Sequence, residues 1–327
     1  MHCGGVTGTT DSRVMTSLLT EGDRSTLRAR LATRLPARWR TRFAPAPTGQ
    51  LHMGHAVNAV YVWSIARAFG GSVLLRIEDH DGRRARDVFD TAIRDDLAWL
   101  GLEPDNVQLG WPSPLRQRSD VTAYETALAS LSARGIAYAC RCSRREILSQ
   151  STDSVEREVR YPGTCRRSEV PLSETPARRV QIGDGAVSFD DLRHGPQAQI
   201  PAQQCGDVLV RDRHGQWTYH FAVTVDDFRQ GVDVIIRGDD LLPSTGRQLL
   251  LAELLGRPAA PLLLHHPLIV RADGAKLSKS HGDTGLSELR SAGWSAATVL
   301  GRAAWLGGLQ PEPTPLTADD LASLWSR

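Results

Sequence analysis

The pattern of apolar and polar residues between positions 40 and 102 predicts strands that alternate with helices. A short strand that begins at Thr41 leads into a strong helical run over 53–69. Residues 72–79 form an apolar run typical of a buried parallel strand, and residues 85–100 have the spacing of an amphipathic helix. Strands separated by helices of this length predict a parallel sheet with right-handed crossovers, which is the doubly wound α/β fold.

The alternation stops at residue 103, and we interpret 103–212 as an insertion between two halves of the sheet. This segment contains one clear helix at 120–134, three clustered cysteines and many proline, glycine and glutamine residues. The first half of the sheet domain is then 40–102 and the second half 213–285.

Beyond Trp217 the alternation resumes. Strands are expected at 218–225, 232–237 and 262–270, with a helix at 244–255. Thr245 and Gln248 have the spacing of a capping box, which supports that helix start. Residues 286–327 are predicted to form two or three short helices.

Residues 1–39 differ from the rest, because they are poor in large apolar residues and rich in glycine, threonine, serine and arginine. We predict a mostly disordered basic extension with a short basic helix near 25–35. Its arginines fit a solvated face, and an arm that contacts RNA is the alternative.

The composition is that of an ordinary globular protein, with 41% apolar residues and 23% charged residues. A net charge of +2 neither requires nor excludes an RNA partner. No membrane span and no signal peptide are predicted, since the chain lacks long uninterrupted apolar runs. Five cysteines, an odd number, favour reduced thiols and a cytoplasmic protein.

Two short segments have the chemistry that a nucleoside triphosphate requires. Residues 42–55 read R-F-A-P-A-P-T-G-Q-L-H-M-G-H, so His52 and His55 fall at the start of the predicted helix, where free N–H groups and partial positive charge favour phosphate. Gly54 lets the backbone approach adenine closely. Residues 276–280 read K-L-S-K-S, and Lys276 and Lys279 are suited to follow a polyphosphate.

The predicted strand ends also carry groups that suit an acidic amino acid. Arg42 and Arg237 end two strands of the sheet, at the edge where doubly wound folds bind ligands. Guanidinium groups bind carboxylates through a bidentate fork. Glu78 could receive an ammonium group at the same edge, and Tyr219 could hydrogen-bond the ligand or cover it.

Together, these segments resemble the HIGH and KMSKS signatures of class I aminoacyl-tRNA synthetases, and R-F-A-P-x-P-T-G is similar to the glutamyl/glutaminyl branch. The resemblance implies a Rossmann-like doubly wound sheet and ATP, with Mg²⁺, as a substrate. It also implies a catalytic role for His52, His55, Lys276 and Lys279, and ATP contacts for His52, Gly54, His55 and Lys279. A third set would bind glutamate: Arg42, Phe43, Ala44, Pro45, Ala46, Glu78, Tyr219 and Arg237. The family usually has serine where this chain has Ala46, so one hydroxyl contact is missing.

The clustered cysteines suggest a metal site within the insertion. Cys140, Cys142 and Cys165 offer three soft thiolates, and structural zinc takes four tetrahedral ligands. Reduced cysteines without metal are the alternative. The pattern C-x-C…Y-x-x-x-C resembles that of the glutamyl-queuosine tRNA(Asp) synthetases, which implies that Tyr161 completes a single structural zinc site.

Fewer than fifty residues follow the lysine segment, so we expect a short helical C-terminal part and no anticodon-binding domain. The resemblance to the glutamyl-queuosine subfamily covers residues 40–320. It implies activation of glutamate without tRNA and transfer to queuosine in the anticodon loop of tRNA(Asp). We expect the protein to be a monomer. A truncated glutamyl-tRNA synthetase and a catalytically silent binding module are the alternatives.

Overall fold

The computed structural model describes residues 14–15, 19–80, 82, 85–106, 115–150, 159–168, 170–271 and 284–326. None of the helices in these ranges is long and apolar enough to cross a membrane.

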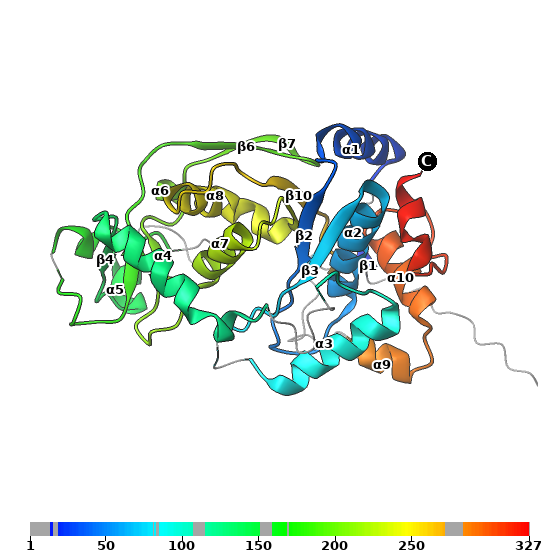
Figure 1. Ribbon diagram of the computed structural model, residues 1–327, viewed down its shortest axis with the longest axis horizontal. Coiled ribbons are helices and arrows are strands. Elements are labelled where there is room, and N and C mark those ends of the chain that lie inside the picture. The colour runs from blue at the N-terminus through cyan, green and yellow to red at the C-terminus, as the bar shows by residue number, and fades with distance from the viewer. Residues whose placement is uncertain are drawn as a thin grey trace, which may run out of the picture.

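The described chain folds into helices and short strands arranged along one long axis (Figure 1). The helices are α1 Glu21–Arg34, α2 Met53–Phe69, α3 Asp87–Leu100, α4 Val121–Ala133, α5 Arg144–Ser149, α6 Pro201–Gln204, α7 Tyr219–Arg229, α8 Thr245–Leu254, α9 Leu286–Ser291 and α10 Ala296–Leu306. The strands are β1 Val14–Met15, β2 Trp39–Phe43, β3 Gly71–Leu75, β4 Ala137–Ala139, β5 Arg178–Val180, β6 Val187–Asp191, β7 Gly195–Gln199, β8 Val208–Arg211, β9 Val234–Gly238, β10 Leu262–His266 and β11 Val270–Arg271. Short 3₁₀ helices occupy Gln117–Ser119, Thr164–Arg167, Asp239–Ser244 and Asp319–Trp325.

The central strands confirm the predicted parallel sheet. Strand β2 pairs in parallel with β3, and β10 pairs in parallel with both β9 and β6. The two groups adjoin where the N–H of Asp233 donates to the carbonyl oxygen of Arg40 at 2.9 Å. Strand β7 adds an antiparallel edge by pairing with β6. These two strands lie within the segment that we assigned to the insertion, so part of that segment belongs to the sheet; the domain boundaries themselves stay predictions.

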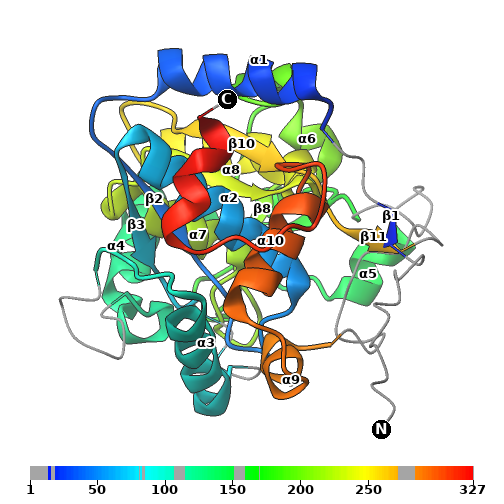
Figure 2. The same ribbon diagram turned by 90° about the vertical axis from the view of Figure 1, so that its right-hand side faces the viewer.

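Helix α2 is the core of the sheet domain. It is apolar on nearly all sides because β2 and β3 pack against one face, while α10 and Asp319–Trp325 pack against the other (Figure 2). Tyr61 and Trp63 are among its fully buried side chains. The helix ends at Gly70, whose φ of 70° is the left-handed conformation that glycine adopts without strain.

The remaining part of the 103–212 segment forms a second lobe at the far end of the long axis (Figure 1). Strands β4, β5 and β8 make an antiparallel sheet there. Helix α4 packs against both β4 and α7, so the lobe rests on the helices that follow it in the chain.

Two predictions about the second half of the sheet domain are wrong. Residues 218–225, predicted as a strand, begin helix α7, because an apolar run that is buried all round looks the same in sequence whether it is a strand or a helix. Thr245 and Gln248 do not form a capping box: α8 has no side-chain cap, and both side chains instead accept hydrogen bonds from Arg237.

The N-terminal region is more ordered than we predicted. Helix α1 begins four residues earlier than the expected basic helix, with a capping box between Thr20 and Asp23. Its Leu27 and Leu31 are buried in the main core, which fixes the helix in place. The expected disorder of residues 1–13 and 16–18 concerns positions outside the described chain.

Candidate active site

The carboxyl ends of β2, β9 and β10 and the start of α2 surround a cavity of about 600 Å³. This is the edge of a doubly wound sheet at which ligands bind. Every predicted ATP or glutamate residue within the described chain lines it: Arg42, Phe43, Ala44, Pro45, Ala46, His52, Gly54, His55, Glu78, Tyr219 and Arg237. Strand β3 ends at Leu75, so Glu78 reaches the cavity from the segment that follows the strand.

Two imidazoles cap the N-terminus of α2. Nδ1 of His52 accepts the N–H of Gly54 at 3.1 Å, and Nδ1 of His55 accepts the N–H of His52 at 3.1 Å. A ring nitrogen that accepts carries no hydrogen, so the neutral tautomer of each ring has its hydrogen on Nε2. Both side chains therefore bring N–H donors to the positively polarised end of a helix, which suits a phosphate.

Gly54→Ala is expected to displace the His52 imidazole. A Cβ atom at position 54 would lie 2.9 Å from Cε1 and 3.1 Å from Nδ1 of His52, closer than ordinary contacts allow. A shift of about 1 Å in an aligned group costs on the order of a hundredfold in rate. The ATP–pyrophosphate exchange rate with glutamate would measure it. Gly22→Ala is the matched control, because a Cβ at that exposed position of α1 would meet nothing nearer than 3.7 Å; equal rates for the two variants would contradict the assignment.

Two buried guanidinium groups face the cavity from neighbouring strands. Arg42 donates from Nε to Oδ1 of Asp227 at 3.1 Å and from Nη1 to the carbonyl oxygen of Ile236 at 3.3 Å. Arg237 is 4% exposed, and burial lowers its pKa, although an arginine side chain stays charged. Guanidinium groups at a cavity suit a carboxylate ligand, which they bind through paired N–H donors.

A chain of buried charges connects Arg42 with Glu78. Asp227 accepts from both Arg42 and Arg76, and Arg76 donates to Oε1 of Glu78 at 2.9 Å. Arg76 is fully buried, so this network holds the carboxylate and the guanidinium in fixed positions. Tyr219 begins α7 beside them; burial, with the charge of Glu78, raises its pKa to about 12, so its phenol remains a hydrogen-bond donor.

Sequence analysis missed the histidine pair at the end of β10. His266 lines the cavity, where its Nδ1 donates to the carbonyl oxygen of Pro267 and its Nε2 accepts from Asn58, each at 2.9 Å. Burial lowers the pKa of His266 to about 4, so this imidazole is neutral. We predicted a strand that continues to residue 270, which hid the position of this pair at the ligand-binding edge.

Lys276 and Lys279 lie outside the described residues, so their roles stay predictions. The chain on each side of that segment does reach the cavity. Ile269 lines the cavity, and Gly285 forms a β-bridge with His52. The described residues on both sides of the lysine segment therefore lie at or next to the cavity.

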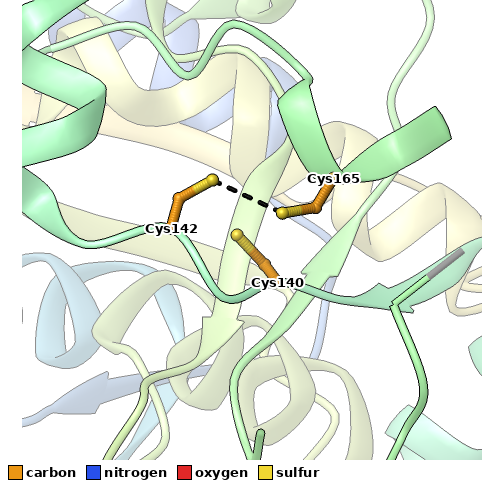
Figure 3. A group of neighbouring side chains, drawn as sticks. All are labelled: Cys140, Cys142 and Cys165. Atoms are coloured by element: carbon orange, nitrogen blue, oxygen red, sulfur yellow. Dashed lines mark hydrogen bonds between the residues drawn. The ribbon is translucent and has the colours of Figure 1, made fainter. Parts of the chain in front are cut away.

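The three clustered cysteines come together in the second lobe (Figure 3). Tyr161 lies beside them. Sγ of Cys142 lies 3.4 Å from Sγ of Cys165 and 3.8 Å from the phenolic oxygen of Tyr161, and that oxygen lies 3.5 Å from Sγ of Cys140. A tetrahedral zinc ion with Zn–S bonds of about 2.3 Å separates its ligand atoms by roughly 3.5–3.8 Å. The donor set and its spacing thus fit zinc.

Neighbouring groups stabilise negative charge at this cluster. Nε of Arg179 donates to Sγ of Cys140 at 3.3 Å, and the guanidinium carbon of Arg179 lies 3.7 Å from the centre of the Tyr161 ring. The N–H of Cys165 donates to the Tyr161 oxygen at 2.8 Å. Burial raises the pKa of Cys142 to about 12, so a bound cation would have to displace the proton of this thiol.

Comparisons with known proteins identify the family. Residues 38–307 match the model for the catalytic domain of class I tRNA synthetases (E and Q). The glutamyl-Q tRNA(Asp) synthetase of Symbiobacterium thermophilum is 40% identical over 292 residues, which are 86% of this chain and 90% of the relative. That of Nitratidesulfovibrio vulgaris is 39% identical over 299 residues, 88% of this chain and 92% of the relative. The chain belongs to the glutamyl-Q tRNA(Asp) synthetase family.

Solved structures agree on the class. A glutamate tRNA ligase from Elizabethkingia meningosepticum, crystallised with its amino acid, superposes with a TM-score of 0.72 at 26% identity. The match covers 87% of this chain and 64% of the ligase, so the chain spans about two thirds of the length of that ligase. Membership of the glutamyl-Q tRNA(Asp) synthetase family confirms the predicted class I fold and a ligase-type enzyme. The zinc, the absence of an anticodon-binding domain and the monomeric state stay predictions.

Proposed function

We propose that this enzyme activates L-glutamate with ATP to glutamyl-adenylate in the absence of tRNA, and transfers the glutamyl group to queuosine in the anticodon loop of tRNA(Asp). The cavity supports the first step, because it combines a helix start whose chemistry suits phosphate with two buried guanidinium groups. The relatives support the second, because their shared name specifies tRNA(Asp) as the acceptor. Class I synthetases use ATP with Mg²⁺, so ATP is the second substrate of the proposed reaction and Mg²⁺ accompanies it.

Adenylation requires alignment rather than a protein nucleophile. The glutamate α-carboxylate attacks the α-phosphorus of ATP, pyrophosphate leaves, and negative charge builds on the phosphate oxygens. In our proposal the Nε2–H groups of His52 and His55 donate to these oxygens, and the positively polarised N-terminus of α2 adds to the stabilisation of their charge. Lys276 and Lys279 neutralise the leaving pyrophosphate.

The buried charges give glutamate a single orientation in this proposal. Arg42 and Arg237 bind its side-chain carboxylate, and Glu78 receives its ammonium group. The cavity-facing hydroxyl that serine would supply is absent at Ala46, so the two guanidinium groups carry most of the carboxylate binding.

The pairing of buried arginines with a histidine-capped helix start carries this proposal, and two assays test it. Pyrophosphate exchange with glutamate and no tRNA is expected to proceed; exchange only with tRNA would favour a truncated glutamyl-tRNA synthetase, and no exchange a silent module. Labelled glutamate should then attach to tRNA(Asp) that contains queuosine and not to tRNA(Asp) that lacks it. Equal labelling of both would contradict the proposed acceptor.

We also propose that Cys140, Cys142, Tyr161 and Cys165 bind one structural zinc ion per chain. All four ligand positions are then protein groups, so no position remains for a catalytic water. We expect Cys142→Ser to reduce zinc content and to lower the unfolding temperature, since metal binding contributes to folding stability. Cys205→Ser is the matched control, because Cys205 is also buried but lies outside the cluster. Purified protein without zinc, or equal metal loss in both variants, would contradict this site.

A further inference from the structure

Arg237 is held by a fully buried carboxylate–imidazole pair that sequence analysis did not identify. Oδ2 of Asp191 lies 2.7 Å from Nδ1 of His265, and Nε2 of His265 lies 2.9 Å from Nε of Arg237. Asp191 and His265 are both 0% exposed. The three residues come from the ends of β6, β10 and β9, which are neighbours in the sheet.

The hydrogen bonds determine the tautomer of His265. Arg237 can only donate, so Nε2 must accept and the hydrogen of the neutral ring is on Nδ1, facing Asp191. Burial raises the pKa of Asp191, but its bonds from His265 and from the turn amides of His194 and Arg193 bring the net pKa below the usual value. Asp191 thus remains an acceptor and keeps His265 in the state that accepts from Arg237.

The other contacts of Arg237 complete its orientation. Nη2 donates to the hydroxyl of Thr245 at 2.9 Å, and Nη1 donates to Oε1 of Gln248. These contacts with described residues use three of the five N–H groups and leave one hydrogen on each terminal nitrogen. Because Arg237 lines the cavity, its terminal edge is available to a carboxylate there.

We propose that Asp191 and His265 are positioning residues that set the orientation of Arg237, and with it the affinity for glutamate and the discrimination against glutamine. Neither residue lines the cavity, so both act through Arg237. This inference rests on the proposed role of Arg237 in glutamate binding. Asp191 also accepts the N–H groups of Arg193 and His194 through Oδ1, so the same carboxylate shapes the β6–β7 turn.

The test compares two replacements of similar length at position 265. His265→Gln places an amide oxygen near the position of Nε2, where it can accept from Arg237, and His265→Met has no such acceptor. His265→Met is expected to raise the glutamate KM in pyrophosphate exchange by about tenfold or more, because misorientation of a positioning group is costly. The KM for ATP should stay within about twofold of the wild-type value, and His265→Gln should recover most of the loss.

Asp191→Asn provides the second measurement, with Asp190→Asn as its control. The asparagine amide would donate to Nδ1 of His265, so the ring would carry its hydrogen on Nε2. That N–H would face the N–H of Arg237 and the hydrogen bond between them would be lost, as happens when asparagine replaces the aspartate of a catalytic triad. Asp190 is adjacent but pairs with Arg34 on α1, so its variant should retain the wild-type glutamate KM. Each variant is checked for native circular dichroism, and if His265→Met does not fold, Asp191→Asn against Asp190→Asn decides the question.

Arg237→Leu separates failure of this inference from failure of the proposed function. If Arg237→Leu raises the glutamate KM while folded Asp191 and His265 variants do not, the positioning role is wrong. If Arg237→Leu also leaves the glutamate KM unchanged, the assignment of Arg237 to glutamate is wrong, and the positioning role falls with it. Equal glutamate KM values for His265→Gln and His265→Met would show that the hydrogen bond accepted by Nε2 of His265 does not position Arg237.

Discussion

Replacing Arg237 with leucine is expected to remove most of the preference for glutamate over glutamine, and not merely to slow both reactions. Glutamine would leave a desolvated guanidinium group unpaired in the wild-type enzyme, at a cost of about 2–5 kcal/mol. This corresponds to a discrimination of about thirtyfold or more, which disappears with the charge. Aspartate should remain a poor substrate, because it is one methylene too short to reach the fork while its α-carboxylate stays aligned on ATP.

Adenylate formation with each of the three amino acids measures this prediction. Arg257→Leu is the matched control, since Arg257 is a partly buried arginine that lies outside the large cavity and donates to the carbonyl oxygen of Val232. Efficient use of glutamine by the wild-type enzyme would contradict the pocket assignment. So would an Arg237→Leu variant with full discrimination.

Replacing Lys279 with alanine is expected to slow adenylation by about a hundredfold or more, with glutamate binding much less affected. Negative charge builds on the leaving pyrophosphate between the ground state and the transition state, so loss of a cation there reduces the rate more than the ground-state affinity. Pyrophosphate exchange gives the rate, and a thermal shift induced by glutamate gives the binding. A near-normal exchange rate would remove Lys279 from the mechanism.

The amino-acid composition allows an independent test of the lysine segment at 276–280. Of 39 lysine and arginine residues in the chain, only Lys276 and Lys279 are lysines. An acetylating reagent therefore meets no other side-chain amines, and mass spectrometry identifies the two sites directly. ATP should protect them, and protection by glutamate alone would place the lysine segment near the amino acid instead.

The sequence was sufficient to predict many of the residues that line the cavity, but not the buried contacts that orient their side chains. Arg42, His52 and Arg237 could be assigned because strand ends and helix starts follow from local patterns. Asp191 and His265 lie 74 residues apart, and nothing in either local pattern indicates that they meet. Long-range pairing of this kind depends on the order of the strands in the sheet. The sequence predicted a doubly wound parallel sheet but not that order.

Tertiary contacts also override local signals at specific residues. Thr245 and Gln248 have the spacing of a capping box, yet the buried guanidinium of Arg237 binds both side chains, and the cost of an unpaired buried charge exceeds the gain of about 1 kcal/mol from a cap. Residues 1–39 contain few large apolar residues, and this composition predicted disorder. Two leucines one helical turn apart, Leu27 and Leu31, nevertheless pack into the main core and help to dock α1.

The hydrophobic core of the catalytic domain extends beyond the residues that match the family model. The family match spans 38–307, but Leu27 and Leu31 lie before it and Trp325 lies after it, all buried in the same core as α2. Trp325 donates from Nε1 to Ser64 at 2.8 Å, and Arg30 of α1 donates to the carbonyl oxygens of Asp191 and Leu192. A fragment limited to residues 38–307 would expose the apolar surface of α2. It would also lose the hydrogen bonds from Arg30 to the β6–β7 turn, where Asp191 contacts His265. Expression trials, chimaeras and minimal versions of this enzyme should therefore extend from before Thr20 to beyond Trp325.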